Sequence, residues 1–193
     1  MLHEVRFKEH EKSELIRGLF PIVNRKSPHL AFKAIHADPS GKLTATDGVL
    51  LAEFTPENGK EIVPPGHWEI RKLTKASTQL EKTAEYNDSK LPETETIFSM
   101  MVGAEKVELP RYLRENRFSF FVWALARRTE QIFNMEMLKL AFPYVADTGE
   151  FMLADGEELV LADGEELVKR FVFAVREGSF RLVLCGMMAK MET

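Results

Sequence analysis

Residues 15–54 read LIRGLFPIVNRKSPHLAFKAIHADPSGKLTATDGVLLAEF, and this stretch decides the expected fold. Its first part has the apolar spacing of a helix that buries one face, formed by Leu15, Ile16, Leu19, Phe20 and Val23. Pro21 is expected to end or bend this helix near Phe20, because proline lacks the N–H group that a helix interior uses. We therefore predict an amphipathic helix over residues 11–23.

Strands are predicted on both sides of this helix. Residues 3–10 and residues 29–37 alternate between two faces, as half-buried strands do. Asp38-Pro39-Ser40-Gly41 is a strong turn sequence. Residues 42–54 resume the strand pattern around Asp47-Gly48, where a tight turn or a bulge is expected. The first part of the chain thus predicts a strand, a helix and then several strands.

A second helix is predicted over residues 134–145, where apolar side chains again have helical spacing. Asn134 is the expected N-cap, and Pro143 is expected to limit the far end. From residue 150 onward the pattern is that of strands. The order of a helix followed by several strands therefore occurs twice.

The middle of the chain has weaker signals. Residues 74–96 are polar and poorly periodic, so a surface excursion is expected there, partly helical over residues 76–85. Residues 97–109 have a strand pattern. Residues 117–133 fit a strand that leads into a helix, and periodicity does not settle which part is which.

Eight residues are repeated exactly in tandem, since residues 153–160 and residues 161–168 both read LADGEELV. A spacing of eight keeps each repeated side chain on its face of a strand, whereas a helix would rotate the face by roughly 80°. The repeat therefore favours β structure, with turns at Asp155-Gly156 and Asp163-Gly164. Its carboxylates lack the spacing of a calcium-binding loop, so we interpret the repeat as a solvated hairpin.

The predicted fold class is α+β, with two strand–helix–meander halves whose two helices pack on antiparallel sheets. The expected organisation is one domain over residues 1–193, with halves at about residues 1–73 and 118–193 and an insertion near residues 74–117.

Several of these segments resemble the bacterial DNA polymerase sliding clamp, the beta subunit of DNA polymerase III. Residues 15–54 are similar to part of a clamp domain, and Leu43-Thr44-Ala45-Thr46-Asp47-Gly48 is similar to the family's strand that ends in Ala-Thr-Asp. Three further segments resemble clamp segments: Ile62-Val63-Pro64, the second helix start FNMEML at residues 133–138, and the closing strand FRLVLCGMM at residues 180–188.

This resemblance implies a DNA-clamp-like fold without catalytic residues, with duplex DNA and replication proteins as partners. A bacterial clamp subunit has three such domains and closes its ring as a dimer, whereas this chain has the length of one. A ring would therefore require a homo-oligomer of about six copies. Gly186 also stands where the closing strand of the family usually has proline. The alternative is a clamp-related protein–protein interaction module, of phage or mobile-element origin, that does not encircle DNA.

Composition excludes several other classes. The chain has 193 residues, 45% of them hydrophobic and 29% charged, which is typical of a folded protein rather than a disordered one. A net charge of −4 excludes nucleic-acid binding through overall basicity and leaves a local basic face open. The single cysteine, Cys185, forms no intrachain disulfide. No apolar run is long enough to span a membrane and no secretory signal is evident, so a cytoplasmic protein without membrane partners is expected.

The resemblance points to Lys and Arg side chains near the two helices as DNA-binding candidates, because a clamp contacts phosphates without reading bases. These candidates are Lys12, Arg17, Arg25 and Lys26 around the first helix and Lys139 on the second, with Arg127 and Arg128 flanking the second. Glu11, Glu14 and Glu136 lie on the same elements and offset the positive charge. An ordinary solvated helix face is therefore the competing interpretation.

A clamp also offers a peptide groove built partly from its C-terminal strand. By position, the partner-binding candidates here are Val183, Leu184, Met187 and Met188. Methionine suits adaptable binding surfaces and core packing alike, so a core role is the alternative.

Enzyme motifs are absent from the sequence, which has no phosphate-cradling loop, no nucleophile elbow and no HExxH motif. No catalytic residue, metal or cofactor is therefore predicted, and an enzyme with an unrecognised carboxylate pair has no positive support. His36 is interpreted as a satisfied core histidine, Cys185 as a small buried hydrophobe and Asp47 as a turn residue.

Overall fold

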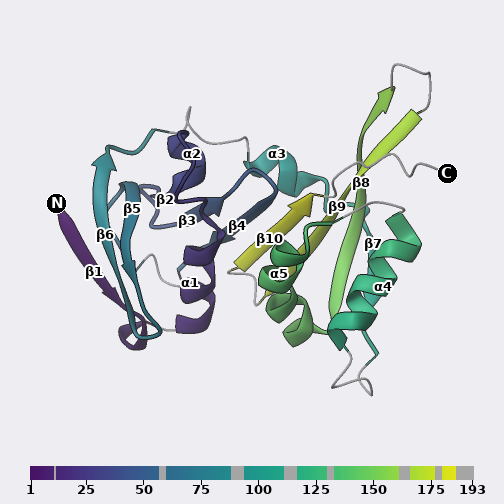
Figure 1. The fold of residues 1–193 in the computed structure, drawn as a ribbon, viewed down its shortest axis with the longest axis horizontal. Helices are drawn as coiled ribbons and strands as arrows, with labels where there is room; N and C mark the ends of the chain where they lie inside the picture. Colours follow the sequence, from purple (N-terminus) through teal and green to yellow (C-terminus); the bar gives the residue numbers. More distant parts are fainter. Residues whose placement is uncertain are drawn as a thin grey trace. The chain divides into compact units, whose positions relative to one another are not determined.

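The stretch over residues 15–54 folds into a short helical segment followed by strands (Figure 1). The structure is a computed structural model, which describes residues 1–10, 12–56, 60–87, 94–110, 117–129, 133–160, 166–176 and 180–185. The chain divides into two compact units, one of Met1–Thr94 with Glu177–Arg181 and the other of Glu95–Arg176 with Leu182–Thr193. Within the described ranges, no helix is both long and apolar enough to cross a membrane.

The predicted first helix is confirmed, although it changes type at Pro21. Helix α1 (Ser13–Leu19) leads directly into the 3-10 turn η2 (Phe20–Ile22). Leu15, Ile16 and Leu19 are at most 1% exposed, and α1 contacts strand β4 (Leu50–Phe54). Pro21 lies in the first turn of η2, where its missing N–H leaves no helical hydrogen bond unmade. Glu11, the expected start of the helix, lies outside the described residues.

The strand predicted before this helix is confirmed only in its first part. Strand β1 spans Leu2–Arg6, and residues Phe7–Glu9 form the 3-10 turn η1 instead. The Phe7 N–H donates to the Ala76 carbonyl at 2.9 Å, and the Phe7 ring packs against Phe20 with centroids 5.7 Å apart. Burial of Phe7 against α1 and η2 therefore ends the strand early.

The strand predicted over residues 29–37 is wrong for its first half. Leu30–Lys33 form one turn of helix, α2, and strand β2 spans only Ala34–Ala37. The His29 carbonyl accepts hydrogen bonds from the N–H groups of Phe32 and Lys33, which closes the helical turn. Alternation over five residues does not distinguish a strand from a single helical turn, since residues 30 and 34 also share a helix face.

Both predicted turns of the first unit are confirmed. Asp38 Oδ1 accepts from the N–H groups of Ser40 and Lys42 at 2.8 and 3.0 Å. Asp47 Oδ1 accepts from Val49 and Leu50 at 2.9 and 2.8 Å and closes the hairpin of β3 (Leu43–Thr46) and β4. Gly48 has a φ of +95°, which a residue with a Cβ rarely adopts.

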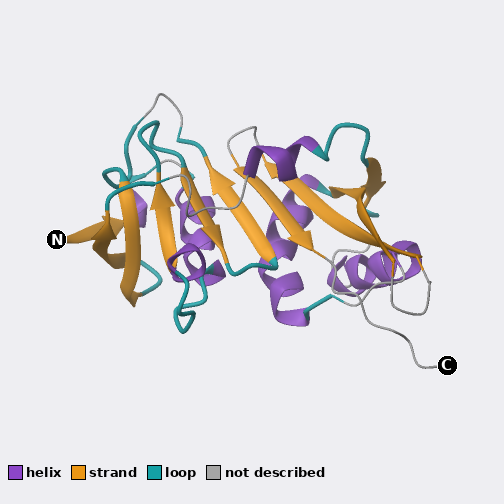
Figure 2. Cartoon of the chain, turned by 90° about the horizontal axis from the view of Figure 1, so that it is seen from above, coloured by secondary structure: helices purple, strands orange, loops and turns teal. Residues whose placement is uncertain are grey.

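The surface excursion predicted over residues 74–96 is wrong for its first part, which is a strand. Strands β5 (Gly66–Leu73) and β6 (Ser77–Ala84) form an antiparallel hairpin, and the sheet has the order β1-β6-β5-β2-β3-β4 (Figure 2). Thr78 and Leu80 are fully buried and alternate with exposed Gln79. The sequence did not reveal this alternation, because only one of the two buried side chains, Leu80, is aliphatic.

The second unit begins with helix α3 (Thr94–Ser99) and strand β7 (Glu105–Glu108), so the strand pattern over residues 97–109 is confirmed only for β7. Helix α4 spans Arg117–Thr129, so the described part of the segment predicted over residues 117–133 begins as a helix and not as a strand. Its buried residues Phe121, Ala124 and Leu125 have helical spacing, which settles the alternative left open by the sequence.

Helix α5 (Met135–Thr148) confirms the predicted second helix and its cap. Asn134 Oδ1 accepts from the N–H groups of Glu136 and Met137 at 2.9 and 3.3 Å. The limit predicted at Pro143 is wrong, since the helix continues to Thr148 and ends at Gly149. Pro143 is exposed and removes one hydrogen bond, while buried Ala141 and Val145 hold the helix on either side of it.

Strands β8 (Glu150–Val160) and β9 (Glu166–Arg176) pair as an antiparallel hairpin that contains the tandem repeat. The β interpretation is confirmed for residues 153–160 and 166–168, and the turn predicted at Asp163-Gly164 lies outside the described residues. The turn predicted at Asp155-Gly156 is wrong, because a register shift between Asp155 and Glu158 makes this a bulge within β8.

Strand β10 (Phe180–Cys185) follows, and the strands of this part of the chain have the order β10-β9-β8-β7. Helix α5 contacts β8 and β9, and α4 contacts α5. Phe121 of α4 meets Phe151 of β8 edge to face, with ring centroids 5.1 Å apart. The chain is therefore a mixture of helices and antiparallel sheet, and the α+β class is confirmed.

Candidate functional site

Three of the predicted DNA-binding cations lie exposed on α1 and on the turn that follows η2. Arg17 is in the last turn of α1, and Arg25 and Lys26 follow η2. Ile22 and Val23 are 1% and 6% exposed, so they anchor this segment and leave the following residues in solvent. We call Arg17, Arg25 and Lys26 the α1 cations.

Local hydrogen bonds fix the backbone beneath Arg25 and Lys26. The Asn24 side chain accepts from the Lys26 N–H at 3.1 Å, and the Asn24 carbonyl accepts from the Ser27 N–H at 2.8 Å. The Asn24 N–H donates to the Phe32 carbonyl at 2.7 Å, which ties the turn to α2. The two cations therefore project from an ordered turn, in which asparagine takes its usual role.

The structure separates the two remaining candidates from this group. Lys12 precedes α1 with a φ of 53° and is half-buried, so its side chain is less available than those of the α1 cations. Lys139 lies on α5 in the other unit, with its ammonium 2.8 Å from the Glu136 carboxylate. That ion pair offsets its charge, as the solvated-face interpretation expected.

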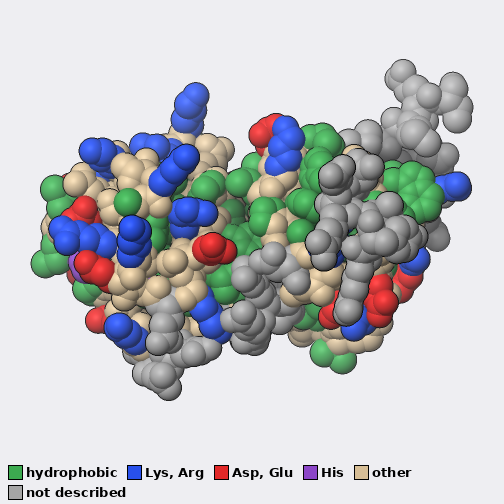
Figure 3. Space-filling view, turned by 90° about the horizontal axis from the view of Figure 1, so that it is seen from below, with side chains coloured by type: hydrophobic (Ala, Val, Ile, Leu, Met, Phe, Trp, Pro, Cys, Tyr) green, Lys and Arg blue, Asp and Glu red, His purple; other side chains and the backbone are tan. Residues whose placement is uncertain are grey.

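Local placement rather than net charge distinguishes the α1 cations. Residues 1–94 contain 14 Lys and Arg and 14 Asp and Glu, so this part of the chain is formally neutral. Among the described residues, no carboxylate lies within ion-pair distance of an α1 cation, whereas Lys33 and Arg71 are paired with Glu69. Figure 3 shows Lys and Arg side chains gathered on one face of the first unit.

An exposed aromatic surface on α4 was not predicted from the sequence. Trp123 is 53% exposed, and its ring lies 5.4 Å from that of Phe120 and 5.5 Å from the Arg127 guanidinium. Arg128, in the same last turn of α4, pairs with Glu105 of β7. The signal was the helical spacing of Phe121, Ala124 and Leu125, which places Trp123 on the opposite face once the segment is known to be a helix.

The residues predicted to bind a partner are not on the described surface. Val183 and Leu184 of β10 are 4% and 0% exposed, so they pack in the interior. This burial favours the core alternative for these two residues, because a partner would have to displace packed side chains to reach them. Met187 and Met188 lie outside the described residues.

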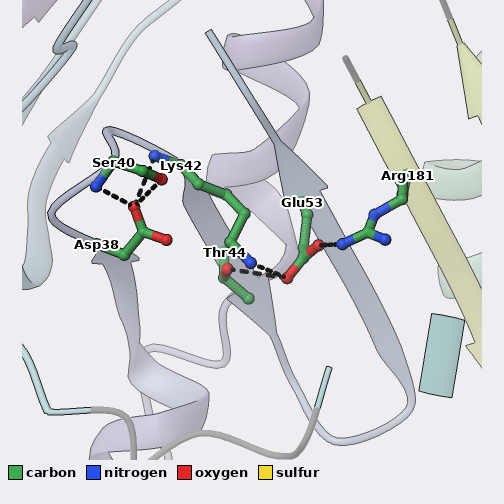
Figure 4. Close-up of polar contacts among 6 residues, drawn as sticks. All are labelled: Asp38, Ser40, Lys42, Thr44, Glu53 and Arg181. Atoms are coloured by element: carbon green, nitrogen blue, oxygen red, sulfur yellow. Dashed lines mark hydrogen bonds and ion pairs between the residues drawn. The ribbon is translucent and has the colours of Figure 1, made fainter. Parts of the chain in front are cut away.

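A buried charge cluster surrounds Glu53, whose side chain is 1% exposed (Figure 4). Its carboxylate pairs with Lys42, which lies 3.3 Å away and directly precedes β3, and with Arg181 at the start of β10. Thr44 lies beside it on the neighbouring strand, at 3.5 Å. The carboxylate is thus satisfied by two cations, which is the condition for burying a charge at tolerable cost.

The described residues offer little for catalysis. They contain no group of three or more His, Cys, Asp and Glu side chains placed to hold a metal ion. A hollow of about 340 Å³ lies in the second unit, lined by residues of the α3–β7 turn and β8. One of its carboxylates, Glu105, is already paired with Arg128.

Comparison with known proteins gives a likeness in structure. No protein-family model matches the sequence, and a search of curated proteins gives no significant match. The DNA polymerase III beta subunit from Thermotoga maritima is similar over 98% of this chain and 66% of its own, with 10% identity and a TM-score of 0.49. The beta sliding clamp from C. crescentus is similar over 97% and 66%, with 12% identity and a TM-score of 0.47. The DNA polymerase III beta subunit from Pseudomonas aeruginosa is similar over 98% and 67%, with 11% identity and a TM-score of 0.44.

These structures belong to the family that the sequence was predicted to resemble. The chain spans about two thirds of the length of each.

Proposed function

We propose that this chain is a non-enzymatic, clamp-like protein that binds the phosphate backbone of duplex DNA through the α1 cations. The observation that supports the proposal is the placement of Arg17, Arg25 and Lys26 on one short, ordered segment without a described carboxylate partner. Cations that are not neutralised within the protein release counterions from DNA when they meet phosphates, which favours binding regardless of base sequence.

The test replaces all three α1 cations with glutamine and measures affinity for a duplex by fluorescence anisotropy. The matched control replaces Lys8, Lys72 and Lys75, which are also exposed in the first unit, and so removes the same charge. We expect the R17Q/R25Q/K26Q variant to lose about tenfold or more in affinity, because each phosphate contact contributes separately. Equal losses in both variants would mean that only net charge matters and would contradict the assignment.

Ring closure is a separate part of the proposal. Six copies of the 22.1 kDa chain, or 6 × 22.1, would have a mass of about 133 kDa. A mass of this size in solution, by light scattering behind a sizing column, would support encirclement of DNA by a homo-oligomer. A mass near that of one chain would remove encirclement and leave binding through the α1 cations to be tested by itself.

The second candidate function is a protein–protein interaction module, and the exposed surface of α4 favours it. Trp and Arg are the residues most enriched at the energetic centres of protein interfaces, and Trp123 lies beneath the Arg127 guanidinium. The partner that fits is a replication protein with an apolar pocket for Trp123 and a carboxylate opposite Arg127. With such a partner purified, W123A should weaken binding by about tenfold or more, whereas S119A, on the same exposed helix, should not.

A further inference from the structure

Two histidines face each other inside the first unit. His36 of β2 and His67 of β5 are direct partners in the antiparallel register, and they are 1% and 0% exposed. Their Nδ1 atoms are 2.5 Å apart, and the rings meet nearly edge to face with centroids 4.7 Å apart. Two nitrogens this close require one N–H donor and one bare acceptor.

The outer nitrogens of the pair decide which ring donates. His36 Nε2 lies 2.9 Å from the Ala31 carbonyl, which only accepts, so Nε2 carries the hydrogen. His67 Nε2 accepts from the Asn87 N–H at 3.1 Å, so that nitrogen is bare. A neutral imidazole has one N–H, hence His67 donates from Nδ1 to His36 Nδ1. The result is a one-way chain from the Asn87 N–H through both rings to the Ala31 carbonyl.

An added proton breaks this chain at one end or in the middle. A protonated imidazole donates from both nitrogens. On His67, the new hydrogen would point at the Asn87 N–H, and on His36 it would point at the His67 N–H. Burial lowers the pKa of His36 from the ordinary value of 6.5 to about 4, with the hydrogen bond to Ala31 and the charge of His67 as smaller influences. His36 is therefore neutral at pH 7.

The segment held by the chain follows strand β6. Asn87 donates to His67, and the Tyr86 ring stacks on the His67 ring with centroids 5.9 Å apart. The neighbouring strands carry Glu69, which pairs with Lys33, and Glu53, which pairs with Lys42 and Arg181. Glu85, which follows β6, pairs with Lys82.

We propose that His36 and His67 form a proton-sensitive anchor, which holds Tyr86 and Asn87 against the first sheet when both rings are neutral and releases them on protonation. The device lies in the fold itself and does not depend on DNA binding.

The test measures histidine tautomers and amide exchange by NMR on the whole chain. At pH 7 we expect the hydrogen on Nε2 of His36 and on Nδ1 of His67. From pH 7 to pH 4, the protection of the Asn87 amide should fall by about tenfold or more relative to the Ala45 and Ala52 amides of the β3–β4 hairpin. Any other pair of tautomers, or an equal loss of protection at all three amides, would overturn the proposal.

A variant at His67 tests whether the loss of Asn87 amide protection in acid depends on the anchor or on a general effect of acid on the chain. H67F removes the acceptor of the Asn87 N–H, so its Asn87 amide should be weakly protected already at pH 7 and insensitive to acid. H29F makes the same substitution at an exposed histidine and should behave as the unchanged chain does. A fully protected Asn87 amide in H67F would contradict the anchor. If H67F does not fold, the measurements on the unchanged chain decide the proposal alone.

Discussion

At the scale of single residues, the buried charge of Glu53 makes the stability of the first unit depend on two cations. Glu53 is 1% exposed and is neutralised by Lys42 and by Arg181, a residue 128 positions later in the chain. A carboxylate in this position is stable only while both cations remain, because an unpaired buried charge loses its hydration without compensation. Arg181 therefore stabilises the first unit, which consists otherwise of Met1–Thr94 and the neighbouring residues of the Glu177–Arg181 segment.

Removing Arg181 should be costly. We expect R181M to lower the free energy of unfolding by about 3 kcal/mol, since it leaves the buried Glu53 carboxylate with one partner fewer. The control R71M breaks an ion pair with Glu81 that is exposed, and it should cost less than about 1 kcal/mol. Urea denaturation of both variants measures the difference. Equal losses of stability in the two variants would contradict a special role for the buried Glu53 carboxylate.

Stability should also depend on pH through His36. Its pKa is about 4 in the folded chain and 6.5 ordinarily, so the unfolded chain binds more protons between these values. Stability is then greatest above pH 6.5 and falls as the pH decreases to 4, by up to about 3 kcal/mol from this residue. Urea denaturation across this range should give a shallower pH dependence for H36Q. The same dependence of the unfolding free energy on pH in H36Q and in the unchanged chain would contradict the low pKa of His36.

At the scale of elements, short-range signals decide which parts of the fold can be predicted. The turns at Asp38 and Asp47 and the cap at Asn134 were predictable because each side chain bonds to backbone within a few residues. Strand β6 was missed because its position depends on pairing with β1 and β5. The α1 cations could be named as candidates from the sequence. The ion pair with Glu136 that distinguishes Lys139 from them could not be predicted. The exposure of Trp123 could be predicted only once residues 117–129 were known to form a helix. The His36–His67 pair could be predicted only from the register of β2 and β5.

The cap of α5 gives a direct test at this scale. N134A should destabilise the chain by about 1 kcal/mol, because the N–H groups of Glu136 and Met137 lose their acceptor. N134D keeps an acceptor in place and should remain within a few tenths of a kcal/mol of the unchanged chain. Thermal denaturation followed by circular dichroism measures both. A larger loss for N134D than for N134A would contradict the capping role.

The tandem repeat should be removable. Deleting residues 161–168 retains the pairs from Met152↔Phe173 to Asp155↔Arg170, and it removes only the pairs beyond the bulge. Strand β7 pairs with residues 150–153, so its contacts are also retained. We expect the deletion to change the free energy of unfolding by less than about 1 kcal/mol. A loss of cooperative unfolding would show that the distal part of the hairpin is required for the fold.

At the scale of the whole molecule, the proposed DNA binding depends on where charge is placed rather than on how much charge the chain carries. The net charge is −4, yet the α1 cations lie within ten residues of the chain, on α1 and on the turn after η2. In the proposed function this segment contacts phosphates, and the salt dependence of its affinity for DNA is then set by the number of phosphates that it neutralises.

The most direct test of this account measures the affinity of the unchanged chain for two duplexes of unrelated sequence across a series of salt concentrations. Three phosphate contacts predict equal affinity for both duplexes and a slope of about −3 in the logarithm of affinity against the logarithm of salt. Affinity should then fall by roughly 40-fold between 50 and 200 mM salt. No detectable binding at the lowest salt, or an affinity that does not change with salt, would contradict the account.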